Sequence, residues 1–305
     1  MKWFRNLVIY QLEETPQFSE QDWQEKLEKD AFHPCLSDQP YSQGWVSPSG
    51  DLGISLCHVG NNSSLLSLRR EERLLPAGVV NEALDEKVSE IELKEDRKLG
   101  RKERSQMKEE IVFEMMPRAF TRSRYTNALL LTNEKLLIVD TSSRNKAEEL
   151  TVQLRKSLGT LKLSPLAVDS STIALFTKWL SGDTPFPASL VVGQSCELRS
   201  TEESSAVIKC SHQDLMSGEL QPHLEAGKVV VKLQLEWNER LSFILNDALE
   251  IKQLRFSDVL QEEAAQDGSS DPAAEFDARF TLMSMELATF LPALITYFGS
   301  EEKTI

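Results

Sequence analysis

The spacing of apolar residues predicts alternating strands and helices along most of the chain. Period-two runs predict strands at 3–12, 189–198 and 206–210, a hairpin over 127–140 and a three-stranded meander over 228–257. Apolar residues three and four positions apart predict helices over 20–29, 143–158, 172–180 and 217–225, and a long last helix over 274–298 that kinks near Pro292. Strands and helices alternate without glycine-rich βα turns, so the predicted class is α+β, with mixed sheets and helices.

Three segments have weaker patterns. Residues 33–53 are rich in proline and glycine and are predicted to form a long ordered loop. Residues 64–75 are predicted to form a hairpin that turns at Arg70–Glu71, and residues 261–271 an acidic, loose connection.

The segment between 76 and 119 predicts a protruding helical hairpin. Pro76 suits the first turn of a helix, Gly100 ends that helix, and a second helix runs from about Ser105 to Met116, before Pro117. The apolar stripe is narrow and the other faces are charged, so the two helices are not expected to form a core layer. The predicted organisation is a central α+β domain (1–75 with 120–165), a helical tip (76–119) and a C-terminal α+β domain (166–305).

Charge adds a functional expectation to this picture. The chain of 305 residues carries a net charge of −14, yet residues 94–124 hold ten basic and six acidic residues, a local +4. Residues 258–305 hold ten acidic and two basic residues. A positive segment on a negative protein suggests a polyanionic partner that is bound on one surface only.

The basic residues of this segment are the candidate nucleic-acid contacts. They are Arg97, Lys98, Arg101, Lys102 and Arg104 around Gly100, and Arg118 and Arg122 beside Phe120 in a predicted turn. Arg69, Arg70 and Arg73 could extend the track. Arginine suits phosphate, and the absence of a base-reading motif predicts sequence-independent binding. The alternative is a solvated helix with salt bridges four residues apart, which Glu90–Lys94 fits and the like-charged Lys94–Lys98 does not.

Catalytic and metal-binding motifs are not found in the sequence. It lacks the glycine-rich nucleotide loops and the GxSxG nucleophile motif. The pairs His33/Cys35, Cys57/His58 and Cys210/His212 lack the spacing of a structural zinc site, and adjacent glutamates such as Glu109–Glu110 do not face each other on a helix. We therefore expect no enzyme activity, no cofactor and no metal.

Location is expected from the same composition. Four scattered cysteines are typical of free thiols in a reducing cytoplasm, and the N-terminal apolar run is interrupted by Arg5 and Asn6, unlike a signal peptide. No transmembrane helix is expected, since Ser284, Glu286 and Thr289 interrupt the most apolar stretch.

Several segments together resemble one protein family. They are MKWFRNLVIYQL at the start, GWVSP at 44–48, RREERLLP ending at 76, MPRAF at 116–120, LIVDTSS from 137, KAEELTVQLRKSLGTL from 146, HLEAGKVVVKLQLEW at 223–237 and FDARFTLMSMELA from 276. In this order, over nearly the full length, they resemble the RdgC family of bacterial recombination-associated proteins.

The resemblance implies a homodimer closed into a ring around duplex DNA. Such a protein would bind double-stranded and single-stranded DNA without sequence preference, associate with the nucleoid in the cytoplasm, and restrain the strand-exchange recombinase. It implies that Arg118 faces DNA and that Phe120 closes a dimer gate. A Lys-Gln-Asp motif of the family corresponds to His212-Gln213-Asp214 here, where a histidine replaces the lysine and Lys209 could compensate.

Three alternatives remain open from the sequence. The last helix is either a core element or a second dimer contact. The protein as a whole could instead be a metal-dependent enzyme that acts on DNA, or an adaptor that uses its acidic surface to bind proteins.

Overall fold

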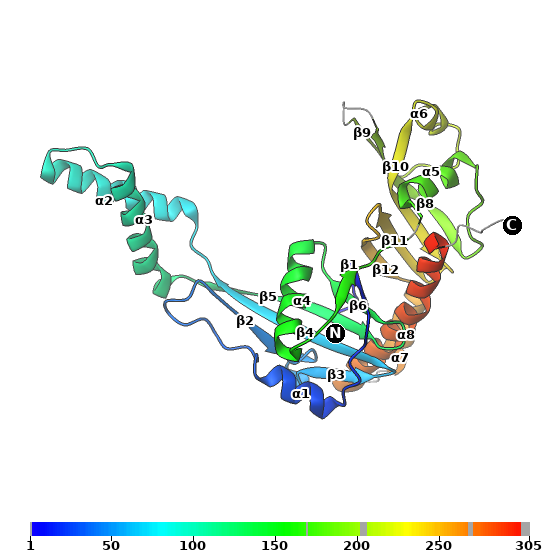
Figure 1. Cartoon of the computed structure of the whole chain (residues 1–305), viewed down its shortest axis with the longest axis horizontal. Coiled ribbons are helices and arrows are strands. Elements are labelled where there is room, and N and C mark those ends of the chain that lie inside the picture. The colour runs from blue at the N-terminus through cyan, green and yellow to red at the C-terminus, as the bar shows by residue number, and fades with distance from the viewer. Residues whose placement is uncertain (1, 169, 202–205, 268–270, 300–305) are drawn as a thin grey trace. The chain divides into compact units, whose positions relative to one another are not determined.

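The computed structural model describes residues 2–299 except 169, 202–205 and 268–270 (Figure 1). The chain forms two compact units. The larger unit comprises Met1–Leu27, Ser47–Ser67 and Thr126–Ile305, and the smaller unit comprises Glu28–Val46 and Leu68–Tyr125. These boundaries differ from the three expected segments, because the helical tip and part of the sheet belong to one unit.

The strands form one sheet with the order β2-β4-β5-β6-β1-β12-β11-β10-β8-β9, and β3 and β7 pair with β4 and β1. Neighbouring pairs from β5 to β9 in this order are antiparallel. The strands are β1 Leu7–Leu12, β2 Tyr41–Val46, β3 Cys57–Gly60, β4 Ser63–Arg73, β5 Thr121–Leu131, β6 Leu136–Asp140, β7 Leu163–Pro165, β8 Leu190–Ser200, β9 Val207–Cys210, β10 Lys228–Trp237, β11 Leu241–Asn246 and β12 Ile251–Phe256. Helices with an antiparallel sheet confirm the mixed α and β class.

The helices confirm most of the predicted periodicity. They are α1 Glu20–Glu28, α2 Ala77–Glu95, α3 Arg101–Met115, α4 Arg144–Leu158, α5 Thr172–Ser181, α6 Gln221–Glu225, α7 Asp258–Asp267 and α8 Pro272–Gly299, with short 3-10 turns η1 Gly50–Leu52 and η2 Met116–Arg118. Helix α4 begins after Ser143 and ends at Gly159, as predicted. Helix α3 begins at Arg101, four residues before the predicted start, because Gly100 is its N-cap.

Helix α8 forms much of the core of the larger unit. The Phe290 ring lies 5.2 Å from that of Trp237 on β10 and 5.0 Å from that of Phe243 on β11. By length and composition alone α8 could cross a membrane. Its Glu286, however, is only 7% exposed and accepts two hydrogen bonds from the Arg240 guanidinium, at 3.0 and 2.9 Å. The interpretation as a core helix is confirmed, whereas a dimer contact stays a prediction.

Three sequence-based predictions are wrong. Residues 63–73 form the single strand β4, because the apolar half and the charged half of the segment are parts of one extended run. Residues 33–53 contain β2 and η1. Residues 258–267 form helix α7, whose Leu260 and Ala264 are buried one turn apart. The many acidic residues around these two positions make the helical spacing difficult to recognise in the sequence.

The ends of two other elements also differ. The first strand begins at Leu7, not Trp3, and α6 is confined to Gln221–Glu225. Pro292 lies inside α8, which continues through it.

Candidate nucleic-acid interface

The smaller unit contains the predicted hairpin, made of α2 and α3 (Figure 1). Its narrow core consists of Val80, Leu84 and Val88 from α2 with Met107 and Ile111 from α3. The turn between the helices is fixed at both ends. Asp96 ends α2 in the left-handed conformation, at φ 51° and ψ 38°, and Glu103 accepts a hydrogen bond of 2.9 Å from the Gly100 amide.

Three of the five predicted cations at this turn are paired with carboxylates of the hairpin itself. Arg97 donates to Glu95 at 2.7 Å and to Glu103 at 2.9 Å, and these two carboxylates raise its pKa. Lys98 lies 3.8 Å from Glu92, and Arg104 lies 3.1 Å from Asp85. Exposed ion pairs of this kind are weak because water screens both charges, so a phosphate could replace a carboxylate at little cost.

Arg101 and Lys102 differ from these three. Both are exposed, and in the part of the chain that the structure describes neither has a carboxylate within ion-pairing distance. The hairpin as a whole is not positive, since residues 77–118 hold nine basic and eleven acidic residues. Arg101 and Lys102 therefore place uncompensated positive charge at the α2–α3 turn, although the hairpin as a whole is not positive.

A second exposed feature follows α3. Phe120, which lies between η2 and β5, is 85% exposed, and Phe113 on the last turns of α3 is 66% exposed. Arg118 is exposed and has no ion pair among the described residues. Arg122 and Arg124 share one carboxylate, Glu72, at 2.7 Å each. The predicted turn is thus confirmed, with Arg118 and Phe120 both accessible.

Arg73, at the end of β4, holds this turn in place. Its guanidinium donates to the carbonyls of Met116 at 3.0 Å and Ala119 at 3.3 Å, on the two sides of Arg118. It also donates to the Leu36 carbonyl at 3.1 Å and to the Cys35 carbonyl at 3.4 Å. The residue after it, Leu74, donates its amide to the Phe120 carbonyl at 2.8 Å. Arg73 therefore has a positioning role and is not a free cation.

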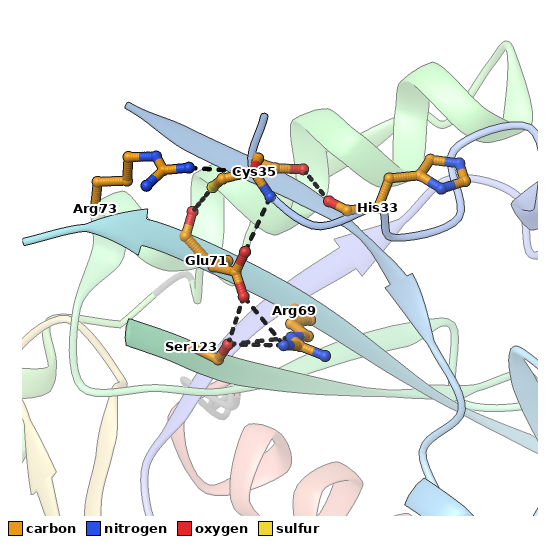
Figure 2. A network of polar contacts seen from close by, with 7 residues as sticks. His33, Cys35, Arg69, Glu71, Arg73 and Ser123 are labelled. Carbon is orange, nitrogen blue, oxygen red and sulfur yellow. Dashed lines mark hydrogen bonds and ion pairs between the residues drawn. The ribbon is translucent and has the colours of Figure 1, made fainter. Parts of the chain in front are cut away.

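Glu71 organises a neighbouring polar network (Figure 2). Its carboxylate accepts hydrogen bonds from the Cys35 amide at 2.9 Å, from Arg69 at 3.2 Å and from the Ser123 hydroxyl at 3.4 Å. The Cys35 amide is the main cause of its lowered pKa, and the Arg69 charge adds to the effect. The network joins the loop before β2 to strands β4 and β5 within the smaller unit.

The remaining arginines of β4 also have partners inside the unit. The Arg69 guanidinium lies 4.1 Å from the centre of the Phe32 ring, and that of Arg70 lies 3.9 Å from the centre of the Tyr41 ring. Arg70 also donates to Gln43 at 3.2 Å. Arg69, Arg70 and Arg73 thus fasten the loop, β2 and the Phe120 turn to β4, and this does not favour the idea that they extend a DNA-binding track.

The larger unit holds the other candidate residues, at the edge strand β9 and just after it. Lys209 on β9 is exposed and lies opposite Glu197 on β8. Glu197 is paired with Lys232 at 2.7 Å, and that contact is the main cause of its lowered pKa. His212 is exposed in a left-handed conformation, at φ 57°. Gln213 donates its side-chain amide to Glu219, so only part of its hydrogen-bonding capacity is free.

Three of the possible metal ligands named in the sequence are buried or have other partners. The Cys35 thiol donates to the Glu71 carbonyl at 3.1 Å, and burial raises the pKa of Cys57. His58 contacts Asp277 at 3.1 Å, with its ring edge-on to Phe276. Among the residues that the structure describes, no three His, Cys, Asp or Glu side chains converge as a metal site.

Comparison with known proteins gives consistent matches over the full chain. A family model described as "Putative exonuclease, RdgC" matches residues 2–301. A protein of Pseudomonas aeruginosa named "Recombination-associated protein RdgC" is 43% identical over 301 residues, which cover 98% of both chains. Proteins of the same name from Aeromonas hydrophila and from Pseudomonas syringae pv. tomato are 42% and 40% identical over 303 and 301 residues, covering 99% and 98% of this chain and 100% and 98% of theirs.

Proposed function

Because the chain belongs to the RdgC family of recombination-associated proteins, we propose that it binds DNA without sequence preference. We propose further that it acts as a homodimeric ring around duplex DNA, associates with the nucleoid in the cytoplasm and restrains the strand-exchange recombinase. Its role is that of a binding protein and not of an enzyme.

The observation that carries the proposal is the placement of uncompensated positive charge. Arg101, Lys102 and Arg118 are exposed without a carboxylate partner among the described residues, in a chain of net charge −14. A protein that is negative overall is repelled by DNA except where local cations face the phosphates. Guanidinium and ammonium groups without base-reading neighbours bind phosphates and do not distinguish sequences.

The exposed Phe120 supports a dimer contact. A phenylalanine that is 85% exposed beside three arginines is an apolar group in a charged surrounding. Burial against the same residue of a second copy would remove about 100 Å² or more from water in each dimer, a gain of a few kcal/mol on the order-of-magnitude scale of apolar burial. Isologous contacts of this type lie on a two-fold axis, and a two-subunit ring needs two of them.

Salt titration of DNA binding tests the proposal. With two unrelated duplexes of equal length, we expect equal affinities and a slope of log K against log salt of about −4 to −5, for about four to six neutralised phosphates. Each ring carries two copies of every residue, so the double variant Arg101→Ala/Lys102→Ala should make the slope less steep by up to about 4. Arg118→Ala should make it less steep by up to about 2 and weaken all sequences alike.

A matched control separates local contacts from total charge. Lys162 in the larger unit is 70% exposed and pairs with Glu13 at 3.2 Å. Lys162→Ala changes the net charge as Arg118→Ala does, and it should leave the slope unchanged. Binding that does not depend on salt, or that prefers one duplex strongly, would contradict the proposal.

The description of the matching family model makes an exonuclease the second candidate function. Incubation of end-labelled duplex with the purified chain and Mg²⁺ or Mn²⁺ distinguishes the two. Release of nucleotides that is lost in a point variant of this chain would establish the enzyme, and stable binding without cleavage would favour the ring. A third possibility, a protein adaptor, would show no binding to plain duplex at low salt.

A further inference from the structure

Two cysteines of the larger unit are direct neighbours across a pair of antiparallel strands. Cys196 on β8 and Cys210 on β9 are register partners. The Ser200 amide donates to the Ala206 carbonyl at 2.9 Å, and counting along the register from that pair makes Cys196–Cys210 a hydrogen-bonded pair as well. In such a pair the two Cα atoms are about 5.5 Å apart and both side chains point to the same face. This separation lies inside the range of about 4.4–6.8 Å found for disulfides.

The two thiols have different surroundings. Cys196 is 6% exposed, whereas Cys210 is partly accessible on the edge strand. The pKa of Cys196 is raised to about 12, chiefly by burial and also by the neighbouring Cys210 thiol. Cys210 is therefore the thiol that a reagent in solution reaches first.

A cavity lies next to this pair of residues. Both cysteines line a hollow of about 340 Å³, together with Lys209, Lys232 and Lys252. Lys232 is paired with Glu197 at 2.7 Å and Lys252 with Glu250 at 2.9 Å. Lys209, next to Cys210 in the chain, adds a further positive charge. Neighbouring residues of a strand point to opposite faces, so Lys209, like Glu197 and Lys232, faces away from the two thiols, and its charge serves to attract an anionic reagent to this edge of the sheet.

We propose that Cys196 and Cys210 form a reversible disulfide, with a small anionic disulfide of the glutathione type as the oxidant. The Cys210 thiolate attacks one sulfur of the oxidant, so that a mixed disulfide forms and one glutathione thiolate leaves. Cys196 then gives its proton to solvent and attacks the sulfur of Cys210, and the second glutathione thiolate leaves. Two protein thiols are oxidised while one oxidant disulfide is reduced to two thiols, and a reducing thiol reverses the exchange.

The bond would tether the edge of the sheet. Strand β9 has four residues, pairs with β8 alone in the strand order, and carries Lys209 directly before Cys210. Only 13 residues separate the two cysteines, so the bond closes a short loop. Closing a loop removes freedom from the opened state of β9. The amides of Ile208 and Cys210, which face β8 in this register, should therefore exchange with solvent at least 10-fold more slowly in the oxidised protein.

Thiol counting on the full-length protein tests the pair. After treatment with oxidised glutathione and unfolding, the wild type should show two reactive thiols out of four, and a peptide map should link the segments of Cys196 and Cys210. Dithiothreitol should restore four thiols. Four thiols after excess oxidant, a link between other cysteines, or equal exchange of the Ile208 and Cys210 amides in both forms would overturn the proposal.

Single substitutions test the order of the steps. In Cys196→Ser, Cys210 should stop at one glutathione adduct, and in Cys210→Ser neither adduct nor disulfide should form. Cys35→Ser, a control in the smaller unit, should still lose two thiols. An adduct on Cys196 in the Cys210→Ser protein would refute the assigned order, and the peptide map of the wild type does not depend on how the variants fold.

Discussion

Arg73→Ala offers the sharpest test of how the Arg118–Phe120 turn is held. The guanidinium makes two good hydrogen bonds, at 3.0 Å to Met116 and 3.1 Å to Leu36, and three longer ones of 3.3–3.4 Å. A hydrogen bond that involves a charged group contributes about 1.5–3 kcal/mol. Only the bonds to Met116 and Ala119 hold the turn itself, and the lower value for each gives about 3 kcal/mol for the closed turn.

This free energy converts to a measurable change in hydrogen exchange. Since 1.4 kcal/mol is about a factor of ten, the amides that close the turn should exchange about 100-fold faster in Arg73→Ala. The relevant amides are those of Leu74, bonded to the Phe120 carbonyl at 2.8 Å, and Ala119, bonded to the Met116 carbonyl at 3.1 Å. Affinity for DNA should fall as in Arg118→Ala, because the free turn no longer presents Arg118.

Two further variants separate position from charge. Arg73→Lys keeps the charge, but one ammonium group cannot reach four carbonyls. The Leu74 and Ala119 amides should therefore recover less than half of the protection from hydrogen exchange that they lose in Arg73→Ala. Arg124→Ala removes the same charge nearby and leaves Glu72 paired with Arg122, so exchange at Leu74 and Ala119 should stay as in the wild type. Full rescue of DNA binding by Arg73→Lys, or unchanged exchange in Arg73→Ala, would refute the positioning role.

Three other substitutions have defined outcomes. Phe120→Ser should open one dimer contact, so that the protein stays dimeric by sedimentation but escapes from closed circular duplex more easily; a monomer would place the only contact at Phe120. Glu71 has a lowered pKa in the folded chain, so its contribution to stability is present above the ordinary glutamate pKa and is lost as the pH falls through the folded value. Glu71→Gln should therefore flatten the acidic limb of the stability–pH curve, measured by urea unfolding, and an unchanged limb would contradict this. Gly44→Ala should destabilise the protein by about 3 kcal/mol, because an added Cβ would lie 2.4 Å from the Phe32 Cα, and an unchanged unfolding midpoint would show that β2 adapts freely.

The regular parts of the fold could be predicted from the sequence because their patterns are local. The β10–β12 meander shows plain alternation, and α4 has Ser143 and Gly159 at its ends. Helix α7 is not evident from the sequence because only two of its apolar residues, Leu260 and Ala264, are buried, and their burial depends on packing against α8, which lies later in the chain.

The candidate site was predictable in its residues but not in their roles. The error at β4 explains why: in a strand, residues two apart share a face. Arg69, Glu71 and Arg73 lie on one face with Cys35 and Ser123, while Glu72, on the opposite face, meets Arg122 and Arg124. A hairpin over residues 64–75 would not have this alternation of faces. For this reason the sequence alone suggests that Arg69, Arg70 and Arg73 are free cations, whereas in the structure they hold neighbouring segments in place.

The pairing of the cysteines was within reach of the sequence. Strands were expected over 189–198 and 206–210, and a hairpin between them brings Cys196 close to Cys210. The register that sets them opposite each other depends on the turn geometry, however, and that is fixed only in the folded sheet.

The buried pair of Glu286 and Arg240 has a consequence that begins before the chain folds. Helix α8 is 28 residues long and is apolar on several faces, so during synthesis it is the segment most readily mistaken for a membrane span. Glu286 lies near its midpoint, where a charged side chain adds about 3 kcal/mol to the free energy of insertion into a bilayer. In the folded protein the same carboxylate accepts hydrogen bonds from Arg240, which is possible in only one rotation of α8 about its axis. If α8 moved along its axis by one turn, Glu286 would be buried without its partner. The same side chain thus makes insertion of the helix into lipid less favourable and fits the helix to one register in the core.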